Sequence, residues 1–154
     1  MLEIRVNDVD LAAVRELWRE YWSDLGMSPD FDGFEEELQS LPGKYGPPGG
    51  GLLLALVDDE PAGAVGLRAL SQDACEAKRL YVRPEFRGKG LGRALMERVI
   101  GYAGTGGFQI LYANTLPSMT EALPLYRKLG FKILDGPYAG IHLPDAIYLE
   151  RRLP

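Results

Sequence analysis

The segment Arg87–Gly92, RGKGLG, combines the residue types that bind a phosphate group. Glycines occupy positions 88, 90 and 92, and Arg87 and Lys89 are interleaved with them. The residues that follow have the apolar periodicity of a helix. The first amides of a helix have no partners within it, and that end of the helix is positive. Because glycines let an anion approach those amides closely, the loop predicts a phosphate or diphosphate site.

Two common phosphate-binding motifs do not fit this loop. A nucleotide-hydrolysing P-loop places Ser or Thr after its Gly-Lys pair, whereas Gly90 follows Lys89 here. The dinucleotide fingerprint is Gly-x-Gly-x-x-Gly, and its spacing differs from the Gly-x-Gly-x-Gly of this chain. A plain connection between a strand and a helix is the remaining alternative. The interleaved basic residues and the break at Pro84 argue against it.

The composition is that of one globular domain. Of the 154 residues, 46% are hydrophobic and 25% are charged, and the net charge of −5 argues against general nucleic-acid binding. The lone Cys75 excludes an intramolecular disulfide and is expected to be a buried thiol rather than an acyl carrier. With His142 as the lone histidine, neither a zinc site nor a Ser-His-Asp triad is expected. The sequence shows no signal-peptide pattern and no membrane-spanning run, so we expect one cytoplasmic domain over residues 1–154 without a metal.

Hydrophobic periodicity predicts the elements that position the loop. Strands are predicted at 2–6, 52–57, 63–70, 75–82, 108–114, 131–134 and 146–153, and four helices lie around Val14–Leu25, Phe34–Leu41, Leu91–Tyr102 and Ser118–Leu129. This order predicts a mixed α/β sheet that is largely antiparallel, with one parallel pair formed by the strands ending near Val82 and Asn114. Asn7 and Asp8 compete as the cap of the first helix.

Regular alternation along the strand 75–82 assigns its side chains to two faces of the sheet. One face would carry Glu76, Lys78, Leu80 and Val82, and the other Cys75, Ala77, Arg79 and Tyr81. Glu76 is therefore expected on the same face as Leu80 and Val82.

In two motifs the chain resembles the GNAT superfamily of acetyl-CoA-dependent N-acetyltransferases. RGKGLG matches the family signature Arg/Gln-x-x-Gly-x-Gly/Ala, and ALPLYRKLGF at 122–131 resembles a later family helix with a Gly-Phe exit. The likeness covers residues 52–133 well and 1–41 in outline. It implies a twisted, mostly antiparallel sheet with helices on both faces, in which the two parallel strands splay apart.

The resemblance also implies where coenzyme A would bind. Its diphosphate would lie on the amides of Arg87 to Gly92, and its pantetheine arm would run beside Leu80–Val82 like an added strand. Asn114 would bond the pantetheine or shape the splay, although a strand-end turn residue is an equal alternative. The implied cofactor-binding residues are Leu80, Tyr81, Val82, Arg87, Gly88, Lys89, Gly90, Leu91, Gly92 and Asn114.

Glu76 and Tyr126 are the candidate catalytic residues. Acetyl transfer needs a neutral amine, whereas a free alkylammonium has a pKa of ~10. It also needs a donor for the oxyanion, by resemblance a backbone amide near Leu80, and a proton for the thiolate. Glu76 is expected to be the base, directly or through water, unless it is a surface residue paired with Lys78 or Arg68. Tyr126 aligns with the family tyrosine that faces the sulfur and is expected to be the acid, unless it is a core residue.

The sequence does not name the acceptor. By resemblance, its site is built from residues 21–34, 44–48 and 138–148, where Trp22 would wall the pocket. Their aromatic and acidic composition suits a cationic amine such as an amino acid, aminosugar or polyamine, or else is a solvated face. The predicted reaction is direct acetyl transfer from acetyl-CoA to a primary amine of a small molecule or peptide. A non-catalytic acyl-CoA-binding module is the alternative, and a homodimer is compatible with both.

Overall fold

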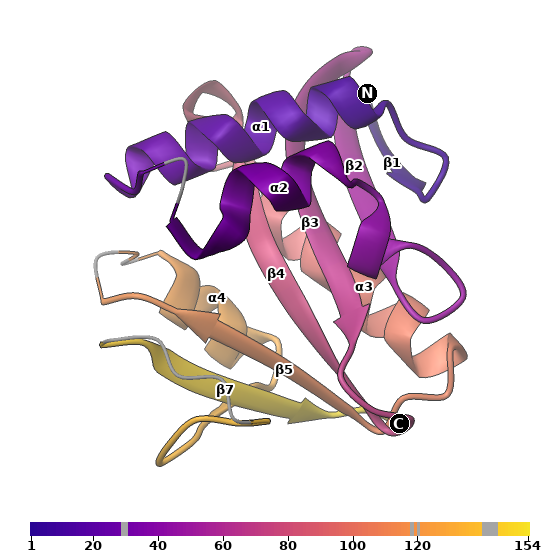
Figure 1. Cartoon of the computed structure of the whole chain (residues 1–154), viewed down its shortest axis with the longest axis vertical. Coiled ribbons are helices and arrows are strands. Elements are labelled where there is room, and N and C mark those ends of the chain that lie inside the picture. The colour runs from indigo at the N-terminus through magenta and orange to yellow at the C-terminus, as the bar shows by residue number, and fades with distance from the viewer. Residues whose placement is uncertain (29–30, 118, 120, 140–144) are drawn as a thin grey trace.

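The structure is a computed structural model that describes residues 1–28, 31–117, 119, 121–139 and 145–154. Its seven strands form one sheet in the order β1-β2-β3-β4-β5-β7-β6 (Figure 1). The strands are β1 (Leu2–Val6), β2 (Gly51–Val57), β3 (Glu60–Ala69), β4 (Ala74–Val82), β5 (Ile110–Thr115), β6 (Lys132–Ile133) and β7 (Ile147–Arg152). The helices are α1 (Leu11–Asp24), α2 (Phe34–Gln39), α3 (Leu91–Thr105) and α4 (Ala122–Lys128). The predicted order of elements is confirmed.

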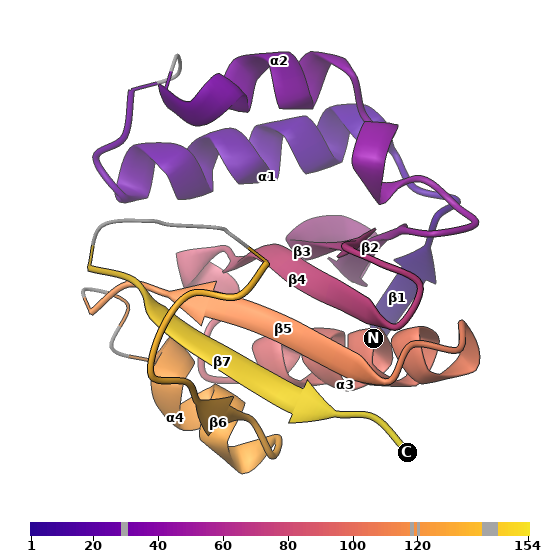
Figure 2. The same cartoon turned by 60° about the horizontal axis from the view of Figure 1, so that its bottom comes forward.

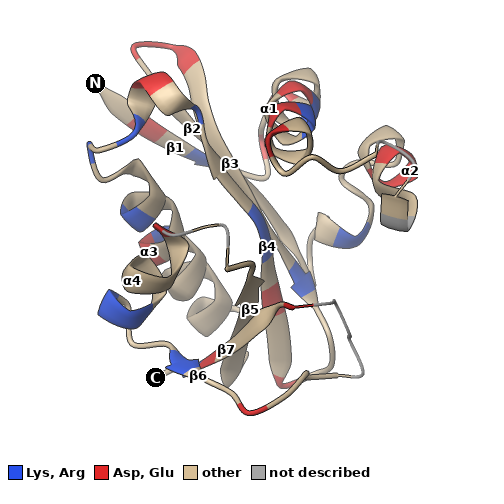
Figure 3. Cartoon of the chain, turned by 90° about the vertical axis from the view of Figure 1, so that its left-hand side faces the viewer, with Lys and Arg blue, Asp and Glu red and all other residues tan. Residues whose placement is uncertain are grey.

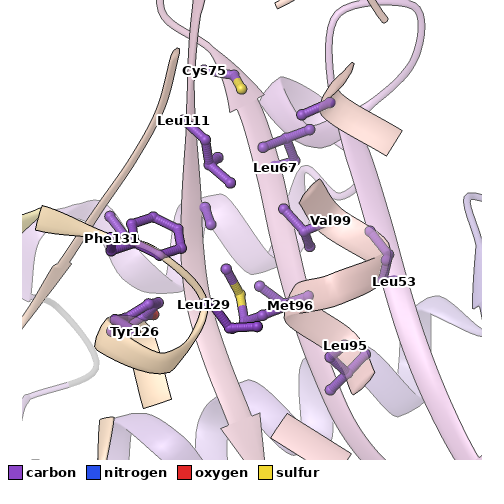
Figure 4. Packing of buried hydrophobic residues seen from close by; sticks show 14 of the residues in the cluster. Leu53, Leu67, Cys75, Leu95, Met96, Val99, Leu111, Tyr126, Leu129 and Phe131 are labelled. Carbon is purple, nitrogen blue, oxygen red and sulfur yellow. The ribbon is translucent and has the colours of Figure 1, made fainter. Parts of the chain in front are cut away.

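Helices cover both faces of the sheet (Figure 2). α1 and α2 lie over one face, and α3 and α4 lie over the other. Apolar side chains fill both interfaces: Trp18, Phe34 and Tyr45 are fully buried on the α1 side. On the α3 side the cluster includes Cys75, Leu95, Met96, Val99, Leu111, Tyr126 and Phe131 (Figure 4). The two cores fix the sheet between the helices, so its strand ends can hold a site rigidly.

Asp10 caps the first helix. Its Oδ1 accepts hydrogen bonds from the amides of Ala12 at 3.0 Å and Ala13 at 3.4 Å. The prediction of Asn7 or Asp8 as the cap was therefore wrong. Asn7 has a left-handed backbone with φ of 68°, and its side chain accepts from the Leu52 amide at 3.1 Å. Its role is to tie the end of β1 to β2, which a local capping pattern does not reveal.

β4 contains a bulge at Arg79. Lys78 pairs with Gly66 and Tyr81 with Ala64, so two residues of β4 face one residue of β3. Arg79 has a left-handed φ of 63°, as the extra residue of a bulge often does. The bulge reverses the alternation that follows it.

The reversal corrects the predicted faces of β4. Leu80 and Val82 pack on the α3 side in the same core as Cys75 and Ala77, while Tyr81 packs on the α1 side. Glu76 therefore lies on the face opposite to Leu80 and Val82, because regular alternation does not continue through Arg79. The buried position of Cys75 was predicted correctly, and burial raises the pKa of its thiol to about 12.

β4 and β5 are the predicted parallel pair, and they separate. Pairing runs from Ala74 with Ile110 to Glu76 with Tyr112. Beyond these residues β4 continues to Val82 on β3, and β5 continues to Thr115 on β7. The backbone edge of β4 that faces β5 is thus unpaired over its second half. An extended ligand can add to that edge by strand-like hydrogen bonds.

Candidate active site

A groove of about 530 Å³ runs from the glycine loop to the splayed strands. Its walls come from the end of β4, the start of α3, the start of α4 and the end of α1. The lining includes Tyr21, Leu80, Tyr81, Val82, Phe86, Arg87, Gly88, Gly90, Leu91, Gly92, Met119 and Leu125. This groove brings together most of the residues that the sequence assigns to cofactor binding.

Unpaired amides line the loop end of the groove. Gly88 and Gly90 have left-handed φ values of 78° and 81°, which glycine adopts without strain. From Gly88 to Arg93, no backbone N–H donates a hydrogen bond to any residue that the structure describes; the first α3 residue with a backbone partner is Ala94, which donates to Gly90. A Cβ atom at either glycine would meet nothing within 4 Å, so the space over the loop is open. Such a row of amides at a positive helix end binds anions.

Arg87 and Lys89 do not take the places expected for them. The Arg87 amide is already occupied, because it donates to the Pro84 carbonyl at 3.2 Å. Its side chain lines the groove and donates from Nε to the Val82 carbonyl at 2.8 Å. Lys89 is exposed and is outside the lining. The open amides therefore begin at Gly88, one residue later than the sequence motif suggests.

A second pocket, of about 130 Å³, lies at the splay of β4 and β5. It shares Tyr21, Leu25, Leu80, Met119 and Ala122 with the groove, so the two spaces are continuous. Asn114 and Tyr126 line it, as does Trp22, which was predicted to wall the substrate pocket. A ligand that extends along β4 from the glycine loop would therefore end in this pocket.

Tyr126 is both a core residue and a pocket residue. Its ring is buried and packs edge-on against Phe131, with ring centroids 5.1 Å apart. Its hydroxyl makes no hydrogen bond to the described residues. The hydroxyl oxygen is not fully enclosed by protein atoms, so it can be reached from the pocket. Burial, with a smaller contribution from Tyr21, raises the pKa of Tyr126, so its phenol keeps its proton. A protonated hydroxyl at the splay suits proton donation.

Glu76 is a buried carboxylate that is held on both oxygens. Arg68 Nε donates to Oε1 at 2.7 Å from the adjacent β3 position, and the Tyr138 hydroxyl donates to Oε2 at 2.6 Å. Asn114 Nδ2 in turn donates to the Tyr138 oxygen at 2.9 Å. The alternative of a surface glutamate is therefore excluded, although Arg68, one of the two partners named with it, does bind Glu76. Glu76 does not line either pocket, and it connects to the splay through Tyr138 and Asn114.

Two acidic residues of α2, next to the predicted acceptor segment 21–34, are paired with basic side chains. Figure 3 marks acidic segments on α1 and α2 and basic segments on the strands near them. Glu37 binds Arg79 at 2.6 Å and Lys44 at 2.8 Å, and Glu35 binds Arg19 at 2.6 Å. Burial alone would raise the pKa of Glu37, but its bonds to Arg79 and Lys44 outweigh burial and lower it to about 2. Glu35 and Glu37 therefore bind α2 to its neighbours and are not available to an acceptor amine.

Lys78 lines the splay pocket, and the sequence had offered it only as a partner for Glu76. Its ammonium has no hydrogen bond or ion pair with the described residues. Burial, followed by the charges of Arg79 and Lys44, lowers its pKa to about 8. Tyr138 lies in the segment 138–148 predicted for the acceptor site, but its contact with Glu76 spans 62 residues and has no local sequence signal. His142 lies outside the described residues.

Within the described ranges, no three or more His, Cys, Asp or Glu side chains are grouped so that they could hold a metal ion. None of the helices described is both long and apolar enough to cross a bilayer.

Comparisons with known proteins agree on one family. Residues 11–131 match the family model described as the acetyltransferase (GNAT) family. An uncharacterised N-acetyltransferase of Schizosaccharomyces pombe is 37% identical over 145 residues, which span 92% of this chain and 87% of that protein. A crystal structure of an acetyltransferase from Streptococcus agalactiae has a TM-score of 0.83 at 20% identity and covers 99% of this chain and 98% of its own. A GNAT family acetyltransferase from Elizabethkingia anophelis with acetyl-CoA bound has a TM-score of 0.72 at 25% identity, with coverage of 99% and 98%.

Proposed function

The chain belongs to the acetyltransferase (GNAT) family and is an acetyl-CoA-dependent N-acetyltransferase, and from that premise we propose how its groove binds the cosubstrate and transfers the acetyl group. The observation that carries the proposal is the row of open amides from Gly88 to Arg93, at the edge of a groove that leads to the splay. A diphosphate on these amides would be bound without any lysine or metal. Arg87, which is exposed beside the groove, would add a charge-assisted contact.

The unpaired edge of β4 supports a place for the pantetheine arm. Beside Leu80, Tyr81 and Val82 the backbone of β4 pairs with β3 on one side and lacks β5 on the other. An amide-bearing chain could use this edge as an added strand. The thioester would then reach the splay pocket, where the backbone amide near Leu80 is the proposed oxyanion donor and Asn114 supports the pocket wall through Tyr138.

Two side chains are proposed to move protons. In the transfer, the amine nitrogen bonds to the acetyl carbon, the carbon–sulfur bond breaks, the nitrogen loses a proton and the sulfur gains one. Tyr126 is the proposed donor to the sulfur, since its protonated hydroxyl lies at the splay and has no hydrogen-bond partner among the described residues. Glu76 is the proposed acceptor of the amine proton.

The geometry favours an indirect path to Glu76. Both of its oxygens are bonded, and the Tyr138 hydroxyl links Oε2 by hydrogen bonds to Asn114, which lines the splay pocket. We propose that Tyr138 passes its own proton to Glu76 while it accepts one from the amine, or from a water bound to the amine. Burial, and then the Glu76 charge, raise the pKa of Tyr138, so the phenol transfers a proton without becoming a stable phenolate.

The test of this proposal is acetyl-CoA binding and amine acetylation by a loop variant. Gly90→Glu puts a bulky anion on the open amides and should remove acetyl-CoA binding in calorimetry and thiol release in an amine screen. Gly107→Glu is the matched control, because Gly107 also has a left-handed φ, of 87°, with open space around it. Native acetyl-CoA affinity in folded Gly90→Glu would contradict the loop assignment.

The remaining sequence-based expectations stay predictions. They are a single domain over residues 1–154, a cytoplasmic location and a homodimer. Sedimentation of the purified chain would decide between monomer and dimer, and cell fractionation would decide the location.

A further inference from the structure

We propose that the acceptor is an α-amino acid with an apolar side chain, and that Lys78 binds its carboxylate in the splay pocket. This inference rests on the proposed function and adds the chemical class of the acceptor. It assigns to Lys78 a binding role that is separate from the proton transfers of Tyr126 and Glu76.

The charges that line the splay pocket are positive. Among the described residues that line it, the ionised side chains are Lys78 and Arg79, and none is Asp or Glu. Arg79 is neutralised, because Glu37 accepts from it at 2.6 Å and 3.2 Å. Its guanidinium also lies over the rings of Trp22 and Phe34. Lys78 is left as the cation without a described counterion.

The surroundings of Lys78 explain why an anionic ligand would be bound there. The charges of Arg79 and Lys44 repel its ammonium, and those of Glu76 and Glu37 attract it. Each of these glutamates is already paired with an arginine, Glu76 with Arg68 and Glu37 with Arg79. A half-buried ammonium without a hydrogen-bonded partner is unfavourable. A ligand carboxylate at this point would supply that partner through a charge-assisted hydrogen bond.

The other walls of the pocket are apolar and define the side chain. They are formed by Trp22, Leu25, Met27, Phe31, Leu116, Met119 and Ala122. An aliphatic side chain can be buried against these residues without leaving a polar group unpaired. The carboxylate would lie at Lys78 and the amine at the splay, near Tyr126. The positive charge of Lys78 would also lower the pKa of that amine, which favours its reactive neutral form.

A polyamine fits this pocket poorly. Its second ammonium would meet Lys78, because no Asp or Glu is among the described residues that line the pocket. Of the nearby acids of α2, Glu37 is paired with Arg79 and Lys44, and Glu35 is paired with Arg19. Like charges in a partly buried site repel strongly. The same argument disfavours an amine that carries no anionic group, since Lys78 would stay without a partner.

The experiment compares L-leucine with isoamylamine, which is leucine without its carboxylate, and with L-leucinamide, which keeps the shape and loses the charge. Binding of each is measured by calorimetry to the protein saturated with coenzyme A, and kcat/KM is measured with acetyl-CoA. We expect wild type to bind leucine at least about 10-fold more tightly than either analogue. Lys78→Met should abolish this preference, and it should fold, because it removes a half-buried charge.

The matched control is Lys132→Met, at an exposed lysine of β6 outside the splay pocket. It should keep the full preference for leucine. Equal binding of the three compounds by wild type, no binding of leucine, or an unchanged preference in Lys78→Met would each overturn the inference. If no amine is acetylated, the proposed function fails, while the calorimetric comparison still decides whether Lys78 binds a carboxylate.

Discussion

The Tyr138 hydroxyl donates a hydrogen bond of 2.6 Å to Oε2 of Glu76, and both side chains are buried. Arg68 holds the other carboxylate oxygen at 2.7 Å. The carboxylate is therefore fixed in place, and its connection to the splay runs through a phenol. A hydrogen-bonded pair of this kind can pass a proton from an amine to a buried carboxylate that the amine does not contact.

Replacement of Tyr138 by phenylalanine tests this connection. Tyr138→Phe keeps the ring stacked on Tyr112, at 4.4 Å between centroids, and keeps the Glu76–Arg68 pair. It removes the hydroxyl, so kcat should fall by about 100-fold at neutral pH while acetyl-CoA affinity is retained. Glu76→Gln should lower kcat similarly. The control is Tyr112→Phe, the same change on the stacked neighbour, and it should leave kcat unchanged. Full turnover in both Glu76→Gln and Tyr138→Phe would remove the relay from the mechanism.

Tyr126→Phe tests the proposed proton donor. The phenylalanine ring can keep the edge-on contact with Phe131, and the hydroxyl it loses has no partner among the described residues. The single-turnover rate of acetyl transfer should drop by roughly 100-fold, with acetyl-CoA affinity within about twofold of wild type. Tyr102→Phe serves as the control. It loses a structural bond of 2.7 Å to the Gly50 carbonyl and should destabilise the fold without slowing transfer. Equal rates for wild type and Tyr126→Phe would refute the donor role.

Glu37 should stabilise the fold in a pH-dependent way. Its pKa is about 2 in the folded chain, against 4.5 for an ordinary glutamate, so its ion pairs contribute fully above pH 4.5 and are lost as the pH falls through 2. A shift of this size corresponds to about 3 kcal/mol. Glu37→Gln should therefore lower the urea unfolding free energy by about that amount at pH 7, with a smaller loss at pH 3. Glu35→Gln breaks an exposed pair with Arg19 and should cost less than about 1 kcal/mol. Equal losses in the two variants would contradict this account.

Lys78 should have the opposite kind of effect on stability. Its pKa is lowered to about 8 from 10.5, so between these values the unfolded chain binds more protons and the contribution to stability rises with pH. Lys78→Met should be more stable than wild type at pH 7, and the difference should shrink towards pH 10.5. Chemical unfolding at several pH values measures it. A Lys78→Met variant that is less stable at pH 7 would show that the ammonium has a stabilising partner.

The sequence predicts the framework of the site better than its contacts. The order of elements follows from apolar periodicity, and the glycine loop predicts open amides, of which those at Gly88 to Gly92 are confirmed. The Arg87 amide was assigned wrongly, because the turn that begins at Pro84 uses it. A motif of residue types does not say which of its amides are already bonded.

The side chains of β4 that are candidates for the site show why their contacts could not be predicted from the sequence. The alternation of side chains between the two faces of β4 breaks at Arg79. The sequence does not indicate the left-handed backbone at this position, because arginine is not a residue that favours positive φ. The contact between Glu76 and Tyr138 joins segments that are distant in the chain. Lys78 has no ion-pair partner among the described residues, because Glu37 forms its ion pairs with Arg79 and Lys44. Such pairings are decided by packing between elements and not by local pattern.

The central claim, that the amides from Gly88 to Gly92 bind the diphosphate of acetyl-CoA, is tested most directly by NMR titration of the chain labelled with ¹⁵N-glycine. We predict that coenzyme A shifts the amide resonances of Gly88, Gly90 and Gly92 strongly, and that 3′-dephospho-coenzyme A, which keeps the diphosphate, does the same. The remote Gly107 and Gly136 should remain in place. Saturable binding of coenzyme A that moves other resonances and leaves those of Gly88, Gly90 and Gly92 unchanged would contradict the account.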